Sequence, residues 1–242
     1  MFGLGTIINV VAIIVGGLLG LLFGRFIKDR HREALSKACG LSVIFIGAAG
    51  ALKGMFSVVE GKIVYGGDFL IIGCLALGAL IGEIINIEGG FEKFGDWLRK
   101  KTGNDGDKSF IDGFLNASFT VCIGAMAIVG AINDGIYGDI SILVTKGILD
   151  FIIVMVMAAS LGKGAIFSAI PVALLQGSVT ALARLISPIM TDAALLNLSV
   201  VGNILIFCVG INLVWDNRIR VANLLPAIVL AVAAAFLPFQ LL

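Results

Sequence analysis

Charged residues are scarce in this sequence, and histidine is nearly absent. Only 14% of the 242 residues are charged, the net charge is +1, and His31 is the single histidine. One histidine supplies neither a histidine-rich metal site nor a histidine proton relay. The balanced charge also argues against a nucleic-acid partner. We therefore expect no metal, no cofactor and no nucleic acid.

The signatures of catalysis are missing as well. The chain contains no GxSxG, HExxH or Walker A sequence and no glycine-rich loop in a dinucleotide-binding context. Its four cysteines lie in apolar segments, without the CxxC or Cys/His spacing of a zinc or redox site. We therefore expect neither an enzyme nor an ATP-driven pump.

Long apolar segments dominate the chain instead. Hydrophobic residues make up 59% of it and the mean hydropathy is +1.09, whereas soluble proteins average roughly 45–50% apolar residues. Eight segments approach or exceed the length of about 20 residues that a helix needs to cross a bilayer. Residues 4–23, 113–133, 164–183, 193–215 and 221–242 are uncharged, while 38–59, 69–87 and 140–162 carry internal charges. This pattern predicts an all-α, polytopic integral membrane protein with eight transmembrane helices in one domain.

Basic residues are distributed unevenly between the connections that join these spans. All but four of the 17 lysines and arginines lie in the first, third, fifth and seventh connections. Because cytoplasmic loops carry an excess of Lys and Arg, we expect these connections to face the cytoplasm and both termini to lie outside. The first charge is Arg25, after the first apolar run, so that run is predicted to be a retained helix rather than a signal peptide.

The longest connection, residues 88–112, contains an amphipathic pattern. Phe91, Phe94, Trp97 and Leu98 recur at helical spacing, with charged residues between them. A helix of this kind either lies in the cytoplasmic interface of the membrane or packs onto the protein.

Glycine is abundant and often spaced by four residues. Residues 16, 20 and 24, residues 50 and 54, and residues 78 and 82 are all glycine. Small residues at this spacing allow helices to approach closely, within the chain or in a homo-oligomer. Similar strings around residues 16–20 and 78–82 also suggest duplicated two-helix hairpins over 1–59 and 68–135, with chance similarity of apolar strings as the alternative.

Four segments of the chain resemble a known family. The opening GTIINVVAIIVGGLLGLLFGRFI, then GLSVIFIGAAGALKG, LGALIGEIINIEGGFEKFGDWLRKK and GFLNASFTVCIGAMAIVGAINDG, resemble the prokaryotic membrane family catalogued as domain of unknown function 554. The resemblance runs over essentially the whole chain and is strongest before Gly135. It implies a bacterial or archaeal inner membrane protein with several spans, and it implies no substrate.

Charges inside the predicted spans mark candidate functional positions, because an ionisable group at the bilayer centre costs about 2.5–3.5 kcal/mol on insertion scales. Asp150 lies about ten residues, or roughly 15 Å, inside its span, near the midplane. Lys146 precedes it by one helical turn on the same face. The two form either a neutralised structural ion pair or a cation or proton site. Glu83 lies nearer the end of its span and is a weaker candidate.

Polar and helix-breaking residues of the neighbouring spans complete the predicted site. Proline frees a backbone carbonyl, and broken helices form solute sites in many transporters. These residues are Asn116, Ser118 and Thr120 in the fourth span and Pro171, Gln176 and Ser178 in the sixth. By contrast, an asparagine such as Asn9 in the first span more often makes a hydrogen bond between helices than binds a ligand.

The favoured function is therefore a secondary transporter or facilitator for a small solute or ion, with its site between the fourth, fifth and sixth spans. Asp150 would carry the coupling or countercharge role, and Gln176, Ser178, Asn116 and Thr120 would orient the solute. The alternative is a non-transporting assembly or sensor module. In that case the basic loops and the amphipathic segment would dock a cytoplasmic partner.

Overall fold

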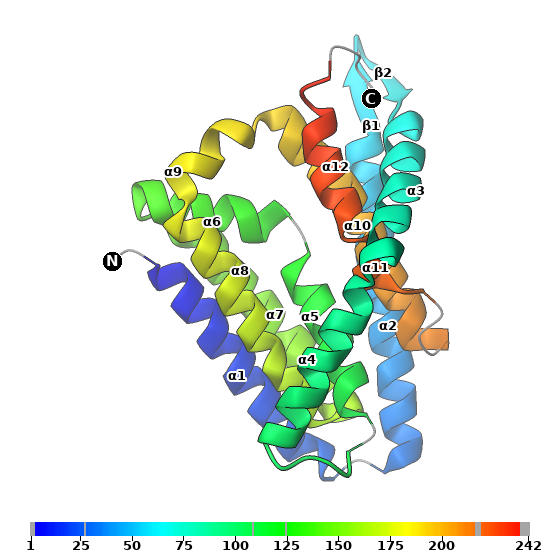
Figure 1. The fold of residues 1–242 in the computed structure, drawn as a ribbon, viewed down its shortest axis with the longest axis vertical. Coiled ribbons are helices and arrows are strands. Elements are labelled where there is room, and N and C mark those ends of the chain that lie inside the picture. The colour runs from blue at the N-terminus through cyan, green and yellow to red at the C-terminus, as the bar shows by residue number, and fades with distance from the viewer. Residues whose placement is uncertain (1–2, 27, 108, 124, 216–218, 238–242) are drawn as a thin grey trace.

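The structure, a computed structural model, describes residues 3–26, 28–107, 109–123, 125–215 and 219–237. Helices account for most of these residues (Figure 1). Five are long: α1 (Leu4–Gly24), α2 (Asp29–Met55), α3 (Asp68–Ile85), α7 (Ser141–Leu161) and α10 (Asp192–Trp215). The others are α4 (Ile87–Lys101), α5 (Phe110–Cys122), α6 (Ala125–Tyr137), the 3₁₀ helix η1 (Lys163–Ser168), α8 (Ala169–Ala181), α9 (Ala183–Ile186), η2 (Ser187–Ile189), α11 (Val221–Leu224) and α12 (Pro226–Ala234).

The all-α membrane fold class is confirmed, whereas the predicted count of eight spans is not. Within the described residues, six helical segments are long and apolar enough to cross a membrane, or seven if α5 and α6 form one span. The last predicted span, 221–242, accounts for one missing span, and the bent pair α5–α6 accounts for a second if it does not cross as one. The helical part of 221–242, Val221–Ala234, is shorter than a span, and residues 238–242 lie outside the described ranges. Pro226 lacks a backbone N–H and begins a new helix, which separates α11 from α12.

The predicted span 38–59 ends early in a β-hairpin. Helix α2 stops at Met55, and β1 (Phe56–Val59) pairs antiparallel with β2 (Lys62–Tyr65). Glu60 and Gly61 connect the strands with φ of 51° and 76°, the left-handed pair of a type I′ turn. The β-branched and aromatic residues here favour strands, but their hydropathy alone had suggested a continuing helix.

Two other predicted spans are not single α-helices. In the segment 113–133, α5 ends at Cys122 and α6 follows after a bend of 61°. In the segment 164–183, the chain begins as the 3₁₀ helix η1 and becomes α-helical only at Ala169, so that Pro171 lies in the first turn of α8. A smaller difference concerns 69–87, where α3 stops at Ile85 and Asn86 adopts a φ of 54° before α4 begins.

The regularly spaced glycines mediate close helix pairs inside the chain. On α1, Gly16, Gly20 and Gly24 face the backbone of the parallel helix α7, and a Cβ atom at Gly20 would lie 2.1 Å from the Met155 carbonyl oxygen. On α2, Gly50 and Gly54 face the Asn203 and Val200 side chains of α10, and Gly82 of α3 faces the backbone of α11. The predicted close contacts are therefore present, and they bury these faces. A homo-oligomer stays a prediction, and it would need another surface.

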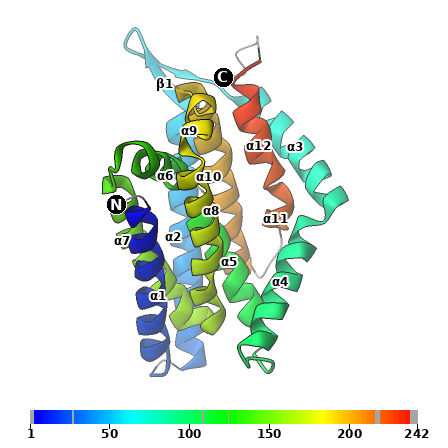
Figure 2. The same cartoon turned by 60° about the vertical axis from the view of Figure 1, so that its left-hand side comes forward.

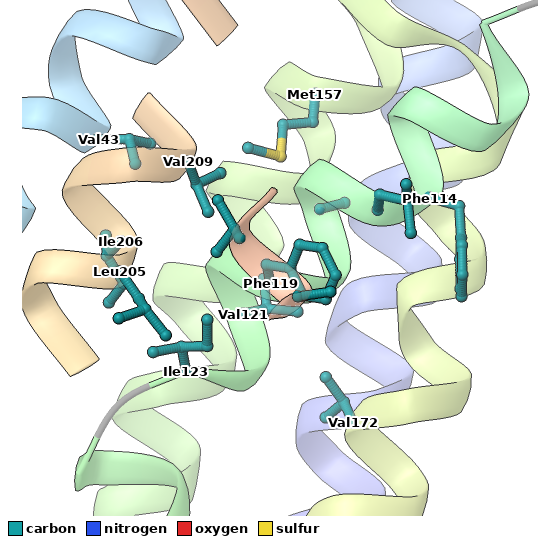
Figure 3. Packing of buried hydrophobic residues seen from close by; sticks show 14 of the residues in the cluster. Val43, Phe114, Phe119, Val121, Ile123, Met157, Val172, Leu205, Ile206 and Val209 are labelled. Carbon is teal, nitrogen blue, oxygen red and sulfur yellow. The ribbon is translucent and has the colours of Figure 1, made fainter. Parts of the chain in front are cut away.

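Helix α5 lies at the centre of the core. Ten of its 13 residues are buried, which is expected of a helix surrounded by others rather than of one that faces lipid. In Figure 3 its Phe119 and Val121 lie between Val209 of α10 and Val172 of α8. The outer helices differ, since large apolar side chains such as Leu18 of α1 and Ile84 of α3 are exposed. Exposed apolar faces on spanning helices suit contact with lipid tails.

The amphipathic helix predicted in 88–112 is α4, and it packs onto the protein. It continues from α3 after the bend at Asn86 and runs toward the end of the molecule where α1 meets α2 (Figure 2). Phe91 stacks edge-on against Phe119 at 5.3 Å, and Phe94 lies against Phe114 of α5.

Several basic connections gather at one end of the bundle. The α1–α2, α4–α5 and α7–η1 connections lie together, and the β-hairpin lies at the other end (Figure 1). Lys163 donates a hydrogen bond of 2.8 Å to the side-chain oxygen of Asn104, which ties two of these connections together. Lys108 and Arg218, two of the basic residues counted from the sequence, lie outside the described residues.

Candidate functional site

The ion pair that the sequence spacing predicted is present in the interior of the bundle. Lys146 and Asp150 lie one turn apart on α7, and they are only 7% and 3% exposed. The Lys146 Nζ donates to both carboxylate oxygens of Asp150, at 2.8 and 2.6 Å. Two charges this deep compensate each other and face protein rather than lipid.

Lys146 also binds the broken end of α5. In an unbroken helix the carbonyl of Val121 would accept the N–H four residues later, but the helix ends at Cys122 and Ile123 is extended, with φ −80° and ψ 122°. The freed carbonyl accepts a hydrogen bond of 2.7 Å from the Lys146 Nζ. The end of a helix carries partial negative charge, so an ammonium group stabilises it. Three acceptors thus meet the three donors of the Lys146 ammonium.

Asn9 of α1, for which the sequence predicted a hydrogen bond between helices rather than ligand binding, completes this cluster. It is completely buried and lies against Gly147 of α7, where a Cβ would be in ordinary contact with the Asn9 Cα at 3.4 Å. Its amide lies beside the Asp150 carboxylate. Neither the nitrogen nor the oxygen of that amide has a partner of ordinary hydrogen-bond geometry in the described structure. The ion pair therefore lies next to an amide whose donor and acceptor are both available for a further hydrogen bond.

Within the described part of the chain, two other predicted residues, Asn116 and Thr120, donate hydrogen bonds only to their own helix. The Asn116 amide donates to the carbonyl of Asp112 at 3.0 Å, and the Thr120 hydroxyl donates to the carbonyl of Asn116 at 2.7 Å. Both carbonyls belong to the preceding turn of α5 itself. Both side chains are buried, so these bonds satisfy them inside the core.

Three further predicted residues line a large apolar cavity. Ser118, Pro171 and Ser178 contribute to its wall, and its volume is about 880 Å³. Most of the remaining wall is apolar, with Phe91, Phe94, Phe114 and Phe119 among its members. Such a surface suits an acyl chain or the apolar part of a ligand better than an ion. The sequence predicted one site that joins these residues to Asp150, whereas neither Lys146 nor Asp150 is among the residues that line the cavity.

Gln176 and Glu83 have different surroundings again. Gln176 is 1% exposed, and neither polar atom of its amide has a partner among the described residues. Glu83 lies at the end of α3, half-exposed, and pairs with Arg220 at 3.1 Å. Such a pair contributes little to stability because water screens it. Glu83 therefore does not join Asp150.

A tight polar junction beside Glu83 links α4 to α11. Glu88 accepts the backbone N–H of Ala222 at 3.1 Å, while its own N–H donates to the side-chain oxygen of Asn223 at 2.8 Å. Burial raises the pKa of the Glu88 carboxyl, and the N–H of Ala222 opposes that rise. This junction holds the bend between α3 and α4 against the last helices.

Comparison with known proteins identifies the family of this chain. A family model described as "Protein of unknown function (DUF554)" matches residues 4–236. The chain belongs to this family. This DUF554 protein is similar over almost its whole length to the "Uncharacterized membrane protein YdfK" of Bacillus subtilis (strain 168). The two chains are 29% identical over 96% of this chain and 95% of the relative.

A second relative gives the same picture. The "Uncharacterized protein YqgA" of Escherichia coli (strain K12) is 31% identical over 94% of each chain. No solved structure matches this DUF554 chain. The comparisons and the apolar helices together make the chain a multi-helix membrane protein.

Proposed function

We propose that this DUF554 protein is a secondary transporter or facilitator that moves a small solute or ion across the prokaryotic inner membrane. The observation that carries the proposal is the buried Lys146–Asp150 pair at the broken end of α5. Replacing a buried ion pair with well-packed apolar residues is often neutral or stabilising, so stability alone gives little reason to retain one. A charge pair beside a helix break is also the arrangement that transporters use to bind ions and solutes.

The geometry suggests how such a site responds to a ligand. Lys146 occupies the position that a bound cation would take, between the Asp150 carboxylate and the Val121 carbonyl. A cation or proton that reaches Asp150 competes with the ammonium group for the carboxylate. Lys146 would then release one of its three acceptors, and the link between α5 and α7 would weaken. In this proposal, the bend between α5 and α6 is the element that changes between the two states.

The proposal includes an orientation. The basic connections that gather at one end would face the cytoplasm, and both termini would lie outside. It includes no enzymatic step, no cofactor and no metal.

A thermal-shift screen of the purified protein tests this function. The protein would be heated with amino acids, organic acids, nucleobases and common ions, because a ligand that binds the folded state raises the unfolding temperature. We expect at least one class to raise it. A shift caused by an organic solute should disappear in the double variant Lys146→Met, Asp150→Asn, which removes both charges together. The single variant Glu83→Gln is the matched control, since Glu83 lies outside the cluster and should leave the shift unchanged.

The alternative function has support of its own. The last turn of α4 carries Arg99, Lys100 and Lys101, and Trp97 on the same helix is 54% exposed. A screen without any hit, together with a soluble protein that binds the wild type and not a Trp97→Ala, Lys101→Glu variant, would replace the transporter with a docking module.

A further inference from the structure

A second buried carboxylate, Asp134 of α6, lies near the start of α1. It is 1% exposed, and its Oδ2 accepts the backbone N–H of Gly5 at 3.0 Å. The residue before α1 is Gly3, which has no side chain to cap the helix, so Asp134 supplies the cap from another helix. Its Oδ1 has no partner, and no ion pair to Asp134 occurs among the residues that the structure describes.

Two threonines and a backbone carbonyl lie next to the chain neighbours of this carboxylate and its partner Gly5. The hydroxyls of Thr6 and Thr180 lie 3.5 Å apart, and both side chains are buried. Thr6 follows Gly5, which Asp134 caps, and Gly135 lies so close to α8 that a Cβ there would be 2.5 Å from the Thr180 carbonyl oxygen. That carbonyl belongs to the last turn of α8, where the helix end carries partial negative charge. The Gly5 N–H and the positive end of α1 offset part of the carboxylate charge, while the Asp134 Oδ1 and the Thr6 and Thr180 oxygens remain as further acceptors in this region.

We infer that Asp134, Thr6 and Thr180 form a binding site for a small monovalent cation. Carboxylate, hydroxyl and carbonyl oxygens are the ligands that hard cations prefer. One cation of charge +1 neutralises the single carboxylate, and it meets the Oδ1 atom that now lacks a partner. A buried carboxylate is costly without such compensation.

A row of unpartnered polar groups leads from this site toward Asp150. Helix α8 runs antiparallel to α1, with Thr180 beside Thr6, so the next turn inward brings Gln176 to the level of Asn9. None of the four polar atoms of these two amides makes a hydrogen bond of ordinary geometry within the described structure. Asn9 in turn lies beside Asp150.

The row is separate from the apolar cavity. Pro171, Leu174 and Ser178 of α8 line that cavity, and helical periodicity places them on the opposite face from Gln176 and Thr180. The cation held at Asp134 is then the coupling ion, and Gln176 and Asn9 lie between it and the ion pair. This coupling role, unlike the binding itself, rests on the transport function proposed above.

Cation-dependent stability tests the site. The purified full chain would be titrated with LiCl, NaCl or KCl, with choline chloride holding the ionic strength constant, while intrinsic fluorescence reports the unfolding temperature. We expect at least one alkali cation to raise this temperature saturably. Asp134→Asn should abolish the rise, because the amide oxygen still caps Gly5 but the charge is gone. Thr180→Val should raise the half-saturating concentration about tenfold, which corresponds to losing one neutral ligand worth about 1.4 kcal/mol.

Asp139→Asn is the matched control. Asp139 follows the same helix, is exposed, and accepts the N–H of Ser141 at 2.9 Å, so this variant should keep the wild-type response. The inference is overturned if no alkali cation acts on the wild type, or if Asp134→Asn responds like the wild type. If Asp134→Asn does not fold, Thr6→Val and Thr180→Val decide, and wild-type responses in both overturn the site.

The two proposals fail separately. A solute that stabilises the wild type through Lys146 and Asp150, without any alkali-cation effect, leaves the transport function standing and removes the cation site. A cation response that persists in the Lys146→Met, Asp150→Asn double variant shows that Asp134 binds the ion independently of the pair, as inferred.

Discussion

Lys146 of α7 donates a hydrogen bond of 2.7 Å to the carbonyl oxygen of Val121, one residue before α5 ends. This bond joins the charge pair of α7 to the break between α5 and α6. We therefore expect a substitution in the charge pair to change the stability of the helix break, and the reverse. The consequences can be measured on stability and on ligand binding independently.

Removing one charge of the pair should cost far more than removing both. Lys146→Met leaves the Asp150 carboxylate buried without its cation and should lower the free energy of unfolding by about 3–5 kcal/mol. Adding Asp150→Asn should restore most of this loss, because no net charge remains. Reversible unfolding of the purified variants in detergent measures both values. If the double variant is as unstable as Lys146→Met, the lost bond to Val121 is the larger contribution. If it has normal stability and normal ligand binding, Asp150 has no role in the mechanism.

Glycines on one helix should differ sharply in their tolerance of a side chain. At Gly82 a Cβ would lie 1.9 Å from the Asn223 carbonyl oxygen, whereas at Gly73 on the same helix no atom lies within 4 Å. Gly82→Ala should lower stability by about 1–3 kcal/mol, because the backbones must separate. Gly73→Ala should be neutral or stabilising by up to about 1 kcal/mol, since alanine favours the helix. Unfolding temperatures of the two variants, and of Gly20→Ala on α1, test the contacts. Equal values at residues 73 and 82 would contradict the α3–α11 packing.

Thiol labelling should separate the two ends of the bundle. In a cysteine-depleted chain, a cysteine introduced at Asp105, in the α4–α5 connection, should resist a membrane-impermeant reagent in intact cells. Cysteines at Tyr65 in the hairpin and at Tyr137, which are 51% and 77% exposed, should react. After permeabilisation all three should react, which controls for accessibility. The reverse pattern would invert the orientation, and labelling of all three in intact cells would contradict the number of crossings.

The junction at Glu88 should make stability depend on pH. Burial raises the pKa of this carboxyl in the folded protein above its usual value of 4.5. The folded state then binds more protons than the unfolded state between the two pKa values, so Glu88 favours folding increasingly as pH falls through its folded pKa toward 4.5. Glu88→Gln should remove this contribution, which the unfolding temperature across pH 4 to 8 would show.

Asp96 on the same helix provides a control of opposite sign. A hydrogen bond from Lys100 holds the pKa of Asp96 below its usual value of 3.8. Its contribution to stability is therefore present at neutral pH and is lost as pH falls through the unfolded and then the folded value. Asp96→Asn should change only the acid end of the profile. A Glu88→Gln profile identical to the wild type would show that the carboxyl is solvated in the folded protein.

Much of the architecture follows from local properties of the chain. Hydropathy and length predicted the long helices α1, α3, α7 and α10, because a span in lipid must satisfy its backbone hydrogen bonds within one apolar segment. The spacing of four placed Lys146 and Asp150 on one face, and it did the same for Gly16, Gly20 and Gly24. These relations depend only on the 3.6-residue period of a helix.

Other features came only from the tertiary structure, because hydropathy does not show where an apolar segment ends its helix or becomes a strand. The strings around Phe56 and Ile123 are as apolar as their neighbours, yet one forms a strand and the other ends a helix. The sequence also did not predict which groups the buried polar residues bind. Asp134 caps Gly5, and Lys146 caps Val121, across 129 and 25 residues of chain. Such pairings depend on how whole helices pack, and the tertiary packing alone separated the apolar cavity from the charged cluster.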